Sequence, residues 1–409
     1  MLRIKPFAAV RPLPNIAAQV SSVPYDVVST DEARELAKGN PRSFLHVLKP
    51  EIDLPTGTDP YSDQVYAKAK QALGKLISNG DIVKEDEPKL YLYRQVLEDH
   101  AQIGLVCCCH IDDYNNDVIK KHETTRADKE DDRTRHIDAL NAHPGPVFMT
   151  YRDQAAIDKL VKIDINQRPL FHFVAPDGVT HTVWTVRDSK PYCSLFAQLD
   201  CAYIADGHHR TAAAVRVGAQ RRDANPNHTG NEEYNWFLSV LFPASQLSIL
   251  PYNRIVTDLG NCSAEQVLDQ LGSLGSISET DEATPDRPGV FCFYVAGTWN
   301  RLELDEATID RSDPINSLDV ALLQDRVLAP VFGIDDPRAD KRLDFVGGLD
   351  GTDKLKERVD SGKAQIAFSL YPTTIKQLLS VADAGLVMPP KSTWFEPKLR
   401  SGLLIHMLD

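Results

Sequence analysis

The chain has 409 residues and a formal net charge of −13, so it would repel a polyanion unless its basic residues gathered on one face. A general nucleic-acid-binding role is therefore disfavoured. The length exceeds the roughly 250 to 300 residues at which a single core stops growing, and the 42% hydrophobic residues can bury a sizeable core, which predicts a folded protein of two or three subdomains.

The cysteines and the N-terminus indicate the cellular compartment. There are seven cysteines, an odd number that rules out a complete set of intrachain disulfides, and their spacing is not that of a metal site. Cys107, Cys108 and Cys109 lie in an apolar run, so we expect reduced thiols in the core, with a redox or metal role as the alternative. Residues 1–10 lack the apolar stretch of a signal peptide, and no window approaches the ~18 apolar residues that cross a bilayer. These features predict a cytoplasmic protein without membrane contact.

Residues 1–100 are predicted to form an N-terminal α/β segment. Ser29 or Thr30 can cap a first helix, which Gly39-Asn40-Pro41 ends, and a second helix shows apolar residues at helical spacing. Two runs rich in aromatic and β-branched residues flank a short polar turn and suit an antiparallel hairpin, whose second strand begins the next segment. The predicted helices are residues 30–38 and 61–78, and the predicted strands are residues 42–48, 89–97 and 102–111.

The middle segment, residues 101–250, begins with a charged block at residues 112–138. Such a block usually forms a solvated face, and here it continues into a helix-like tract that ends near Asn141. Beyond it, a buried strand leads directly into Gly207 and an alanine-rich helix, an arrangement that builds sites in α/β proteins. The predicted strands are residues 147–151, 168–174, 179–186, 201–205 and 235–242, and the predicted helices are residues 153–162 and 211–222.

The C-terminal segment, residues 251–409, is predicted to be a further α/β subdomain that begins after a boundary near residue 250. No internal repeat or low-complexity stretch is visible, and the three segments together predict a mixed α/β fold with mixed sheets. The predicted elements are helices at residues 263–274, 319–328 and 374–382 and a hairpin of residues 291–296 with 299–304.

The most informative motif is Asp206-Gly207-His208-His209-Arg210, which Thr211 follows. It lies between a predicted strand and a helix, whose first backbone N–H groups have no intrahelical partners and favour an anion. Gly207 permits a tight turn and a close approach to a ligand, Arg210 offers a planar fork suited to phosphate, and Thr211 adds a hydroxyl. The motif therefore predicts a phosphate-binding loop.

The other side chains of this motif leave several roles open. Asp206 can hold a Mg²⁺ ion that bridges phosphates, or it can act as a base toward a substrate hydroxyl, and both roles fit a phosphotransferase. The structural alternative for Asp206 is a helix N-cap. His208 and His209 can donate, accept or bind a metal, and their alternative is that of packed, hydrogen-bonded histidines.

Several short motifs follow one another along the chain. They are Pro6-Phe7, Arg11-Pro12, Pro24-Tyr25-Asp26-Val27, Asn40-Pro41 with Ser43-Phe44, His122-Glu123, the Asp206–Arg210 motif, and Met388–Phe395 with Pro397-Lys398-Leu399. In these motifs the chain resembles the domain-of-unknown-function 1015 family over nearly its whole length. The Asp-Gly-His-His-Arg element of that family is similar to a loop of the ParB and sulfiredoxin superfamily. The resemblance implies a ParB/sulfiredoxin-like catalytic core at residues 101–250 with additional N- and C-terminal subdomains.

The resemblance also implies roles for individual residues. Free-serine kinases of that superfamily carry a similar Asp-Gly-His-x-Arg segment and an upstream glutamate that acts as the catalytic base. By this resemblance Asp206, His208 and Arg210 match the nucleotide loop, and Glu123 is the candidate base. Sulfiredoxin needs a cysteine where this chain has histidines, so sulfinic-acid reduction is not supported, and the ParB helix-turn-helix and basic surface are not visible in this acidic chain.

Two further stretches are candidates for substrate binding. The tail segment Lys391-Ser392-Thr393 follows the rigid Pro389-Pro390 and can clasp a phosphate or a carboxylate; the alternative is a terminal strand that packs Trp394-Phe395. Tyr25-Asp26 can line the pocket, or it can form a turn.

The leading functional hypothesis is phosphoryl transfer from ATP or ADP, with Mg²⁺, to a hydroxyl of a small molecule such as free serine. Glu123 or Asp206 would deprotonate that hydroxyl. One alternative is a ParB-like nucleotide-binding regulatory protein without turnover. Another is a metal-dependent hydrolase with His208, His209 and Asp206 as ligands, although the chain has no His-Glu-x-x-His motif. The expected partners are a nucleotide and a small-molecule substrate, and assembly into a homo-oligomer stays open.

Overall fold

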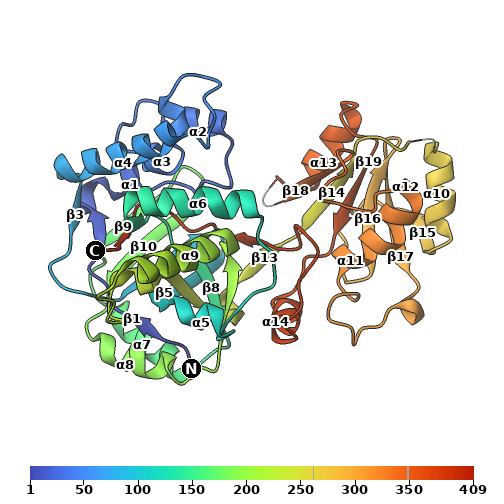
Figure 1. Ribbon diagram of the computed structural model, residues 1–409. Coiled ribbons are helices and arrows are strands. Elements are labelled where there is room, and N and C mark those ends of the chain that lie inside the picture. Colours follow the sequence, from blue (N-terminus) through green and yellow to red (C-terminus); the bar gives the residue numbers. More distant parts are fainter. Residues whose placement is uncertain (261, 348–349) are drawn as a thin grey trace. The chain divides into compact units, whose positions relative to one another are not determined.

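The chain forms two compact units. The computed structural model describes residues 1–409 except 261 and 348–349. The first unit comprises Met1–Leu247 and Pro397–Asp409, and the second comprises Ser248–Glu396. Each unit combines helices with sheets (Figure 1), so the predicted mixed α/β class is confirmed.

The C-terminal residues belong to the first unit. The sequence grouped residues 251–409 into one subdomain, but the strand β21 (His406–Met407) pairs with β7 (Ala142–His143) of the first unit. In this ladder His406 lies opposite His143. The pairing joins residues that are far apart in sequence, and no local sequence pattern predicts such a contact.

A mixed sheet forms the centre of the first unit. Its strands are β1 (Ile4–Lys5), β4 (Tyr91–Leu97), β5 (His100–His110), β6 (Ile119–Lys120), β8 (Val147–Tyr151), β9 (Phe171–Val174), β10 (Thr180–Thr185), β11 (Ala202–Asp206) and β12 (Trp236–Pro243). They lie in the order β6-β11-β8-β12-β5-β4-β10-β9, with β1 beside β5. Cys107, Cys108 and Cys109 of β5 are free and fully buried, as predicted. Because consecutive strand residues point to opposite faces, both faces of β5 must be covered.

Helices cover this sheet, and two short ladders complete the unit. The helices are α1 (Ala17–Val20), α2 (Thr30–Ala37), α3 (Leu45–Leu48), α4 (Asp63–Ser78), α5 (Ile111–Asn115), α6 (Ala127–Leu140), α7 (Ala155–Asp164), α8 (Ser189–Phe196) and α9 (His208–Ala224), and β2 (Val10–Pro12) pairs with β3 (Ile82–Lys84). Helices α6 and α9 pack side by side (Figure 1). Small residues let α9 approach its neighbours: a Cβ at Gly218 would come within 2.5 Å of the Tyr234 carbonyl oxygen, so glycine is required there.

Two predictions for the first unit need correction. Residues 42–48 do not form a strand, because Leu45–Leu48 is the short helix α3. Its Val47 and Leu48 pack into one core cluster together with the preceding Phe44. The charged block is only partly a solvated face, since α6 buries Asp132 and His136 within it. In both cases tertiary packing overrides the local pattern.

The second unit contains an antiparallel sheet of its own. Its strands are β14 (Tyr252–Val256), β15 (Gly275–Glu279), β16 (Val290–Val295), β17 (Thr298–Leu304), β18 (Leu343–Gly347) and β19 (Ile366–Leu370), in the order β15-β17-β16-β19-β14-β18. The predicted hairpin of residues 291–296 with 299–304 is confirmed as β16 and β17. A small ladder pairs β13 (Ser248–Leu250) with β20 (Trp394–Glu396).

The helices of the second unit are α10 (Ala264–Gly272), α11 (Asp319–Leu323), α12 (Ala329–Phe332), α13 (Gly351–Asp360) and α14 (Ile375–Asp383). The segment between α11 and α12, Gln324–Leu328, is a π-helix, so the helix predicted at residues 319–328 is present with wider winding at its end. Among all helices of the described residues, none combines the length and the apolarity needed to cross a membrane.

Candidate phosphate-binding site

The site is built on the turn between β11 and α9. The strand ends at Asp206, Gly207 has φ +98°, and α9 begins at His208, three residues earlier than the sequence predicted. A Cβ at Gly207 would lie 3.1 Å from the guanidinium carbon of Arg210, and a φ of this sign disfavours every L side chain. Glycine therefore allows both the turn and the position of Arg210 over it.

Asp206 is held between two cations. Its Oδ2 lies 3.1 Å from Nζ of Lys398, and its Oδ1 lies 3.9 Å from Nη2 of Arg210. Burial alone would raise the pKa of Asp206, but Lys398 and Arg210 outweigh it and hold this pKa well below its usual range. The N-cap of α9 is Gly207, without a side-chain capping bond, so Asp206 does not serve as the N-cap.

Arg210 has a largely buried guanidinium, with a side chain that is 12% exposed. Its Nη1 donates to the carbonyl of Pro146, and its Nη2 lies 3.8 Å from Oδ2 of Asp26. Its Nε has no hydrogen-bond partner within the part of the chain that the structure describes. Burial lowers the pKa of Arg210, yet the carboxylates of Asp26 and Asp206 more than offset this and raise it above its usual value. A permanent positive charge is thus fixed beside the helix N-terminus.

His208 connects the loop to Glu123. The buried His208 places Nδ1 3.6 Å from Oε2 of Glu123, and its ring packs edge-on against His122 at a centroid distance of 4.5 Å. Burial, together with the neighbouring His122, holds the pKa of His208 well below its usual range. Burial also lowers the pKa of His122 to about 4. Both rings are therefore neutral at pH 7.

His209 and Thr211 have partners within the protein. Nε2 of His209 accepts a hydrogen bond of 3.0 Å from the backbone N–H of Arg126. The Thr211 hydroxyl donates to the carbonyl of Gly207 at 3.1 Å, and Thr211 is fully buried. Both residues hold the first turn of α9 in place.

The other predicted residues fall into two places. Tyr25 and Asp26 lie near the loop, where the Arg133 guanidinium is 4.0 Å from the centre of the Tyr25 ring. Lys391-Ser392-Thr393 belongs to the second unit. There Ser392 donates to the Pro389 carbonyl at 2.6 Å and accepts a hydrogen bond from Thr373 at its own carbonyl. The structure thus brings Tyr25, Asp26, Glu123 and the loop together within the first unit.

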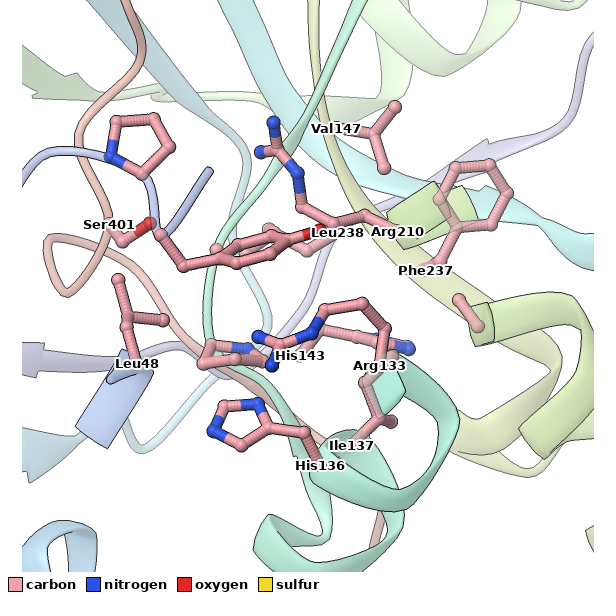
Figure 2. A pocket seen from close by; sticks show the side chains of 15 residues that line it. Leu48, Arg133, His136, Ile137, His143, Val147, Arg210, Phe237, Leu238 and Ser401 are labelled. Atoms are coloured by element: carbon pink, nitrogen blue, oxygen red, sulfur yellow. The ribbon is translucent and has the colours of Figure 1, made fainter. Parts of the chain in front are cut away.

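A small cavity of about 30 Å³ lies beside Arg210. Its wall combines apolar residues with a few polar side chains, and Figure 2 shows Arg210 on one side and Arg133 with His136 on the other. The remaining polar members of the wall include Tyr25, His143 and Ser401. This volume accommodates only a few water-sized groups, so it can hold one end of a small ligand.

The sequence did not identify Lys398, Arg133, His136 or His143 as site residues. Lys398 lies in a quoted motif, Pro397-Lys398-Leu399, but its pairing with Asp206 spans 192 positions. Arg133 and His136 lie in the charged block, where a solvated face was the expected outcome.

No cluster of three or more His, Cys, Asp or Glu side chains is arranged to hold a metal ion in the described ranges, residues 1–260, 262–347 and 350–409. The imidazoles of His208 and His209 are instead engaged by Glu123, His122 and the backbone of Arg126. A hydrolase that uses both histidines and Asp206 as metal ligands thus has no preformed site here.

A family model described as "Protein of unknown function (DUF1015)" matches residues 4–321. No curated protein matches the chain. Among solved structures, SbnI with a C-terminal truncation from Staphylococcus aureus is 13% identical, with a TM-score of 0.39, covering 74% of this chain and 87% of its own. A free serine kinase mutant in complex with AMP is 13% identical, with a TM-score of 0.36, covering 71% and 87%. A conserved hypothetical protein from Pyrococcus furiosus is 13% identical, with a TM-score of 0.35, covering 73% and 93%.

Proposed function

The chain belongs to the family of proteins of unknown function DUF1015, and we propose that it transfers a phosphoryl group from ATP or ADP to a hydroxyl of a small molecule such as free serine. The turn at Asp206–Arg210 binds the nucleotide phosphates. The proposal rests on the geometry and charge of this turn.

One observation carries the proposal: Arg210 stands at a helix N-terminus, and its buried Nε has no hydrogen-bond partner among the described residues. A buried donor without a partner costs about 1–3 kcal/mol, which a bound acceptor recovers. The first backbone N–H groups of α9 also lack intrahelical partners and favour an anion. A phosphate oxygen satisfies both needs at the same place.

Asp206 suits a metal ligand better than a base. Its pKa lies well below the usual range, so the carboxylate is ionised at pH 7 but only weakly basic. Oδ2 of this carboxylate is paired with the Lys398 ammonium at 3.1 Å, whereas Oδ1, 3.9 Å from Arg210, is the oxygen that a metal ion would approach. Mg²⁺ is commonly bound by one or two carboxylates together with substrate phosphates, and when bound it neutralises the charge on those phosphates. We therefore assign Asp206 to Mg²⁺.

Glu123 is then the candidate base. Its side chain is partly exposed and lies 3.6 Å from Nδ1 of the buried His208. A neutral imidazole at this distance can orient the carboxylate without removing its negative charge. Glu123 would accept the proton of the substrate hydroxyl, while the loop positions the phosphates.

The test combines binding with product detection on the full chain. ATP and ADP are titrated calorimetrically with and without Mg²⁺, and the protein is then incubated with each nucleotide, Mg²⁺ and hydroxyl-bearing amino acids before mass spectrometry. We expect saturable nucleotide binding and a phosphorylated amino acid. Binding without product from either donor would instead favour the regulatory alternative. The absence of both binding and product would contradict the phosphate site itself.

A further inference from the structure

A chain of hydrogen bonds leads from the edge of the first unit to the cavity beside Arg210. Glu233 accepts hydrogen bonds from Lys5, at 2.8 Å on one oxygen, and from Nε2 of His406, at 2.7 Å on the other. Nδ1 of His406 in turn lies 3.1 Å from Nδ1 of His143, which lines the cavity. The register of β7 and β21 places the two imidazoles opposite each other, and their rings stack at a centroid distance of 5.4 Å.

The Glu233 carboxylate determines which nitrogens in this series of hydrogen bonds carry protons. Burial would raise the pKa of Glu233, but the hydrogen bonds from His406 and Lys5 lower it, so the carboxylate is ionised and can only accept. Nε2 of His406 must therefore carry a proton. Burial lowers the pKa of His406, so its ring is neutral and its Nδ1 has a lone pair.

The same logic extends to His143. Because Nδ1 of His406 can only accept, Nδ1 of His143 must donate to it. Burial, followed by the neighbouring His406 and Arg221, holds the pKa of His143 well below its usual range, so its ring is also neutral. Nε2 of His143 is then a bare acceptor, and it is buried without a hydrogen-bond partner among the described residues.

A second imidazole in the cavity wall is fixed in a similar way. Nε2 of His136 lies 2.8 Å from the carbonyl of Val47, and a carbonyl can only accept, so this nitrogen carries the proton. Burial lowers the pKa of His136 to about 3. The cavity therefore has two neutral imidazoles in its wall, and each has one nitrogen that can only accept.

We propose that this cavity is the subsite for a hydrogen-bond-donating end of a small ligand, an amine or a hydroxyl, which donates to Nε2 of His143. Glu233 and His406 are positioning residues that hold His143 in the accepting tautomer. The small volume admits this end of the ligand and little more. The inference rests on the proposed function only in taking this ligand as the phosphoryl acceptor.

The experiment observes the imidazole nitrogens directly. The full chain is labelled with ¹⁵N-histidine, and long-range ¹H–¹⁵N spectra are recorded without nucleotide or Mg²⁺, with His143→Gln used for assignment. We expect pyridine-like signals for Nε2 of His143 and Nδ1 of His406. Methylammonium chloride and methanol, which distinguish an amine from a hydroxyl, should each be tested; saturable movement of the His143 Nε2 signal by either one supports the subsite. Tetramethylammonium, which has the charge but no N–H, should leave the signal in place.

Variants of Glu233 test the positioning role. Glu233→Leu should replace the single tautomer of His143 by a tautomeric average, whereas Glu233→Gln, whose amide oxygen still accepts from His406, should retain it. His228→Leu is the matched control, because it breaks the neighbouring His228–Glu232 pair at 2.9 Å and removes no partner of Glu233. A protonated Nε2 of His143 in the wild-type protein, or no response to either donor probe, would overturn the proposal. Because the experiment omits nucleotide, its result does not depend on whether the protein transfers a phosphoryl group.

Discussion

The two units each contain a glycine at positive φ with an arginine packed over it. In the first unit Gly207 has φ +98° and the guanidinium of Arg210 lies where a Cβ would point. In the second unit Gly289 has φ +84°, and Nη2 of Arg311 would be 2.8 Å from its Cβ. An aspartate accompanies each pair: the half-buried Asp206 in the first unit and the buried Asp319 in the second. The local ingredients are thus alike.

The pKa values of the two aspartates are nevertheless shifted in opposite directions. Lys398 and Arg210 lower the pKa of Asp206 against the effect of burial. Asp319 accepts a hydrogen bond from the N–H of Gly289, and its other oxygen has no partner in the described residues, so burial raises its pKa to about 7. Arg311 does not lower the pKa of Asp319 enough to offset burial, because its guanidinium donates two hydrogen bonds to Glu306, at 2.7 Å each.

The guanidiniums of the two turns differ in how closely carboxylates engage them. The second unit has a far larger pocket, of about 710 Å³, beside Gly289 and Arg311. Its arginines are committed, however: Arg311 pairs with Glu306, and Arg287 pairs with Glu303 at 2.7 Å. The distance from the guanidinium to the nearest carboxylate, more than cavity size, distinguishes the two turns: it is 3.8 Å for Arg210 and 2.7 Å for Arg311.

The largest effect is expected from Asp206→Asn. Loss of the carboxylate removes the proposed Mg²⁺ ligand, and turnover should fall by about 100-fold or more, as for the removal of one strong electrostatic contact in other active sites. The measurement is the rate of phosphorylated product at saturating nucleotide and Mg²⁺. Asp319→Asn is the same change in the second unit and should leave this rate unaltered. Equal losses in the two variants would indicate a stability effect rather than a catalytic one.

Arg210→Ala should weaken nucleotide binding by about 1.5–3 kcal/mol, the usual range for a hydrogen bond to a charged group. This corresponds to a roughly 10- to 150-fold higher dissociation constant in calorimetry. Arg216→Ala is the matched control, because Arg216 lies on the same helix and pairs with Asp131. We expect the affinity of that variant to match the wild type. An unchanged affinity of Arg210→Ala would refute the phosphate role of the turn.

Gly207→Ala tests the turn with a smaller perturbation. The left-handed backbone costs an L residue about 1–2 kcal/mol, and the new methyl group would press on Arg210. We expect a lower unfolding midpoint in urea together with weaker nucleotide binding. Gly289→Ala, which has the same strain against Arg311, should lower stability without changing nucleotide affinity. A loss of affinity in both variants would mean that the turn has no special connection to the nucleotide.

Local patterns in the sequence sufficed to predict the strand, turn and helix around Gly207. A buried apolar run, a glycine and an alanine-rich segment follow one another there, and the structure confirms β11 and α9. Residues 42–48 misled the prediction, because their apolar residues fit a strand as well as the short helix that the surrounding core selects. Short apolar runs have no period long enough to decide between the two.

The contacts that define the site were beyond the reach of local patterns. Lys398 meets Asp206 across 192 positions, and His406 meets His143 across 263 positions through the pairing of β21 with β7. No periodic pattern in the sequence predicts either contact. The lowered pKa of Asp206 depends on its distant partner Lys398, so the direction of this shift could not be predicted from the sequence.

The smallest effect on the chemistry is expected from Asp319→Asn, which should change only how the stability of the second unit depends on pH. In the unfolded chain Asp319 titrates near 3.8, whereas in the folded protein burial raises its pKa to about 7. Below pH 3.8 the carboxyl is protonated in both states. As the pH rises from about 4 to about 7, the unfolded chain loses this proton while the folded protein keeps it, so the free energy of unfolding falls.

The asparagine variant cannot ionise, so its stability should not show this fall, and the difference between variant and wild type should grow across that range and level off above pH 7. Hydrogen exchange of peptides from β16 and α11, measured at several pH values, reports the second unit alone. Asp206→Asn provides the opposite sign in the first unit: the lowered pKa of Asp206 stabilises the folded state above pH 4, and this contribution is lost as the pH falls below it. Parallel slopes for the two variants would show that the pKa values of the two carboxyls are not shifted in opposite directions.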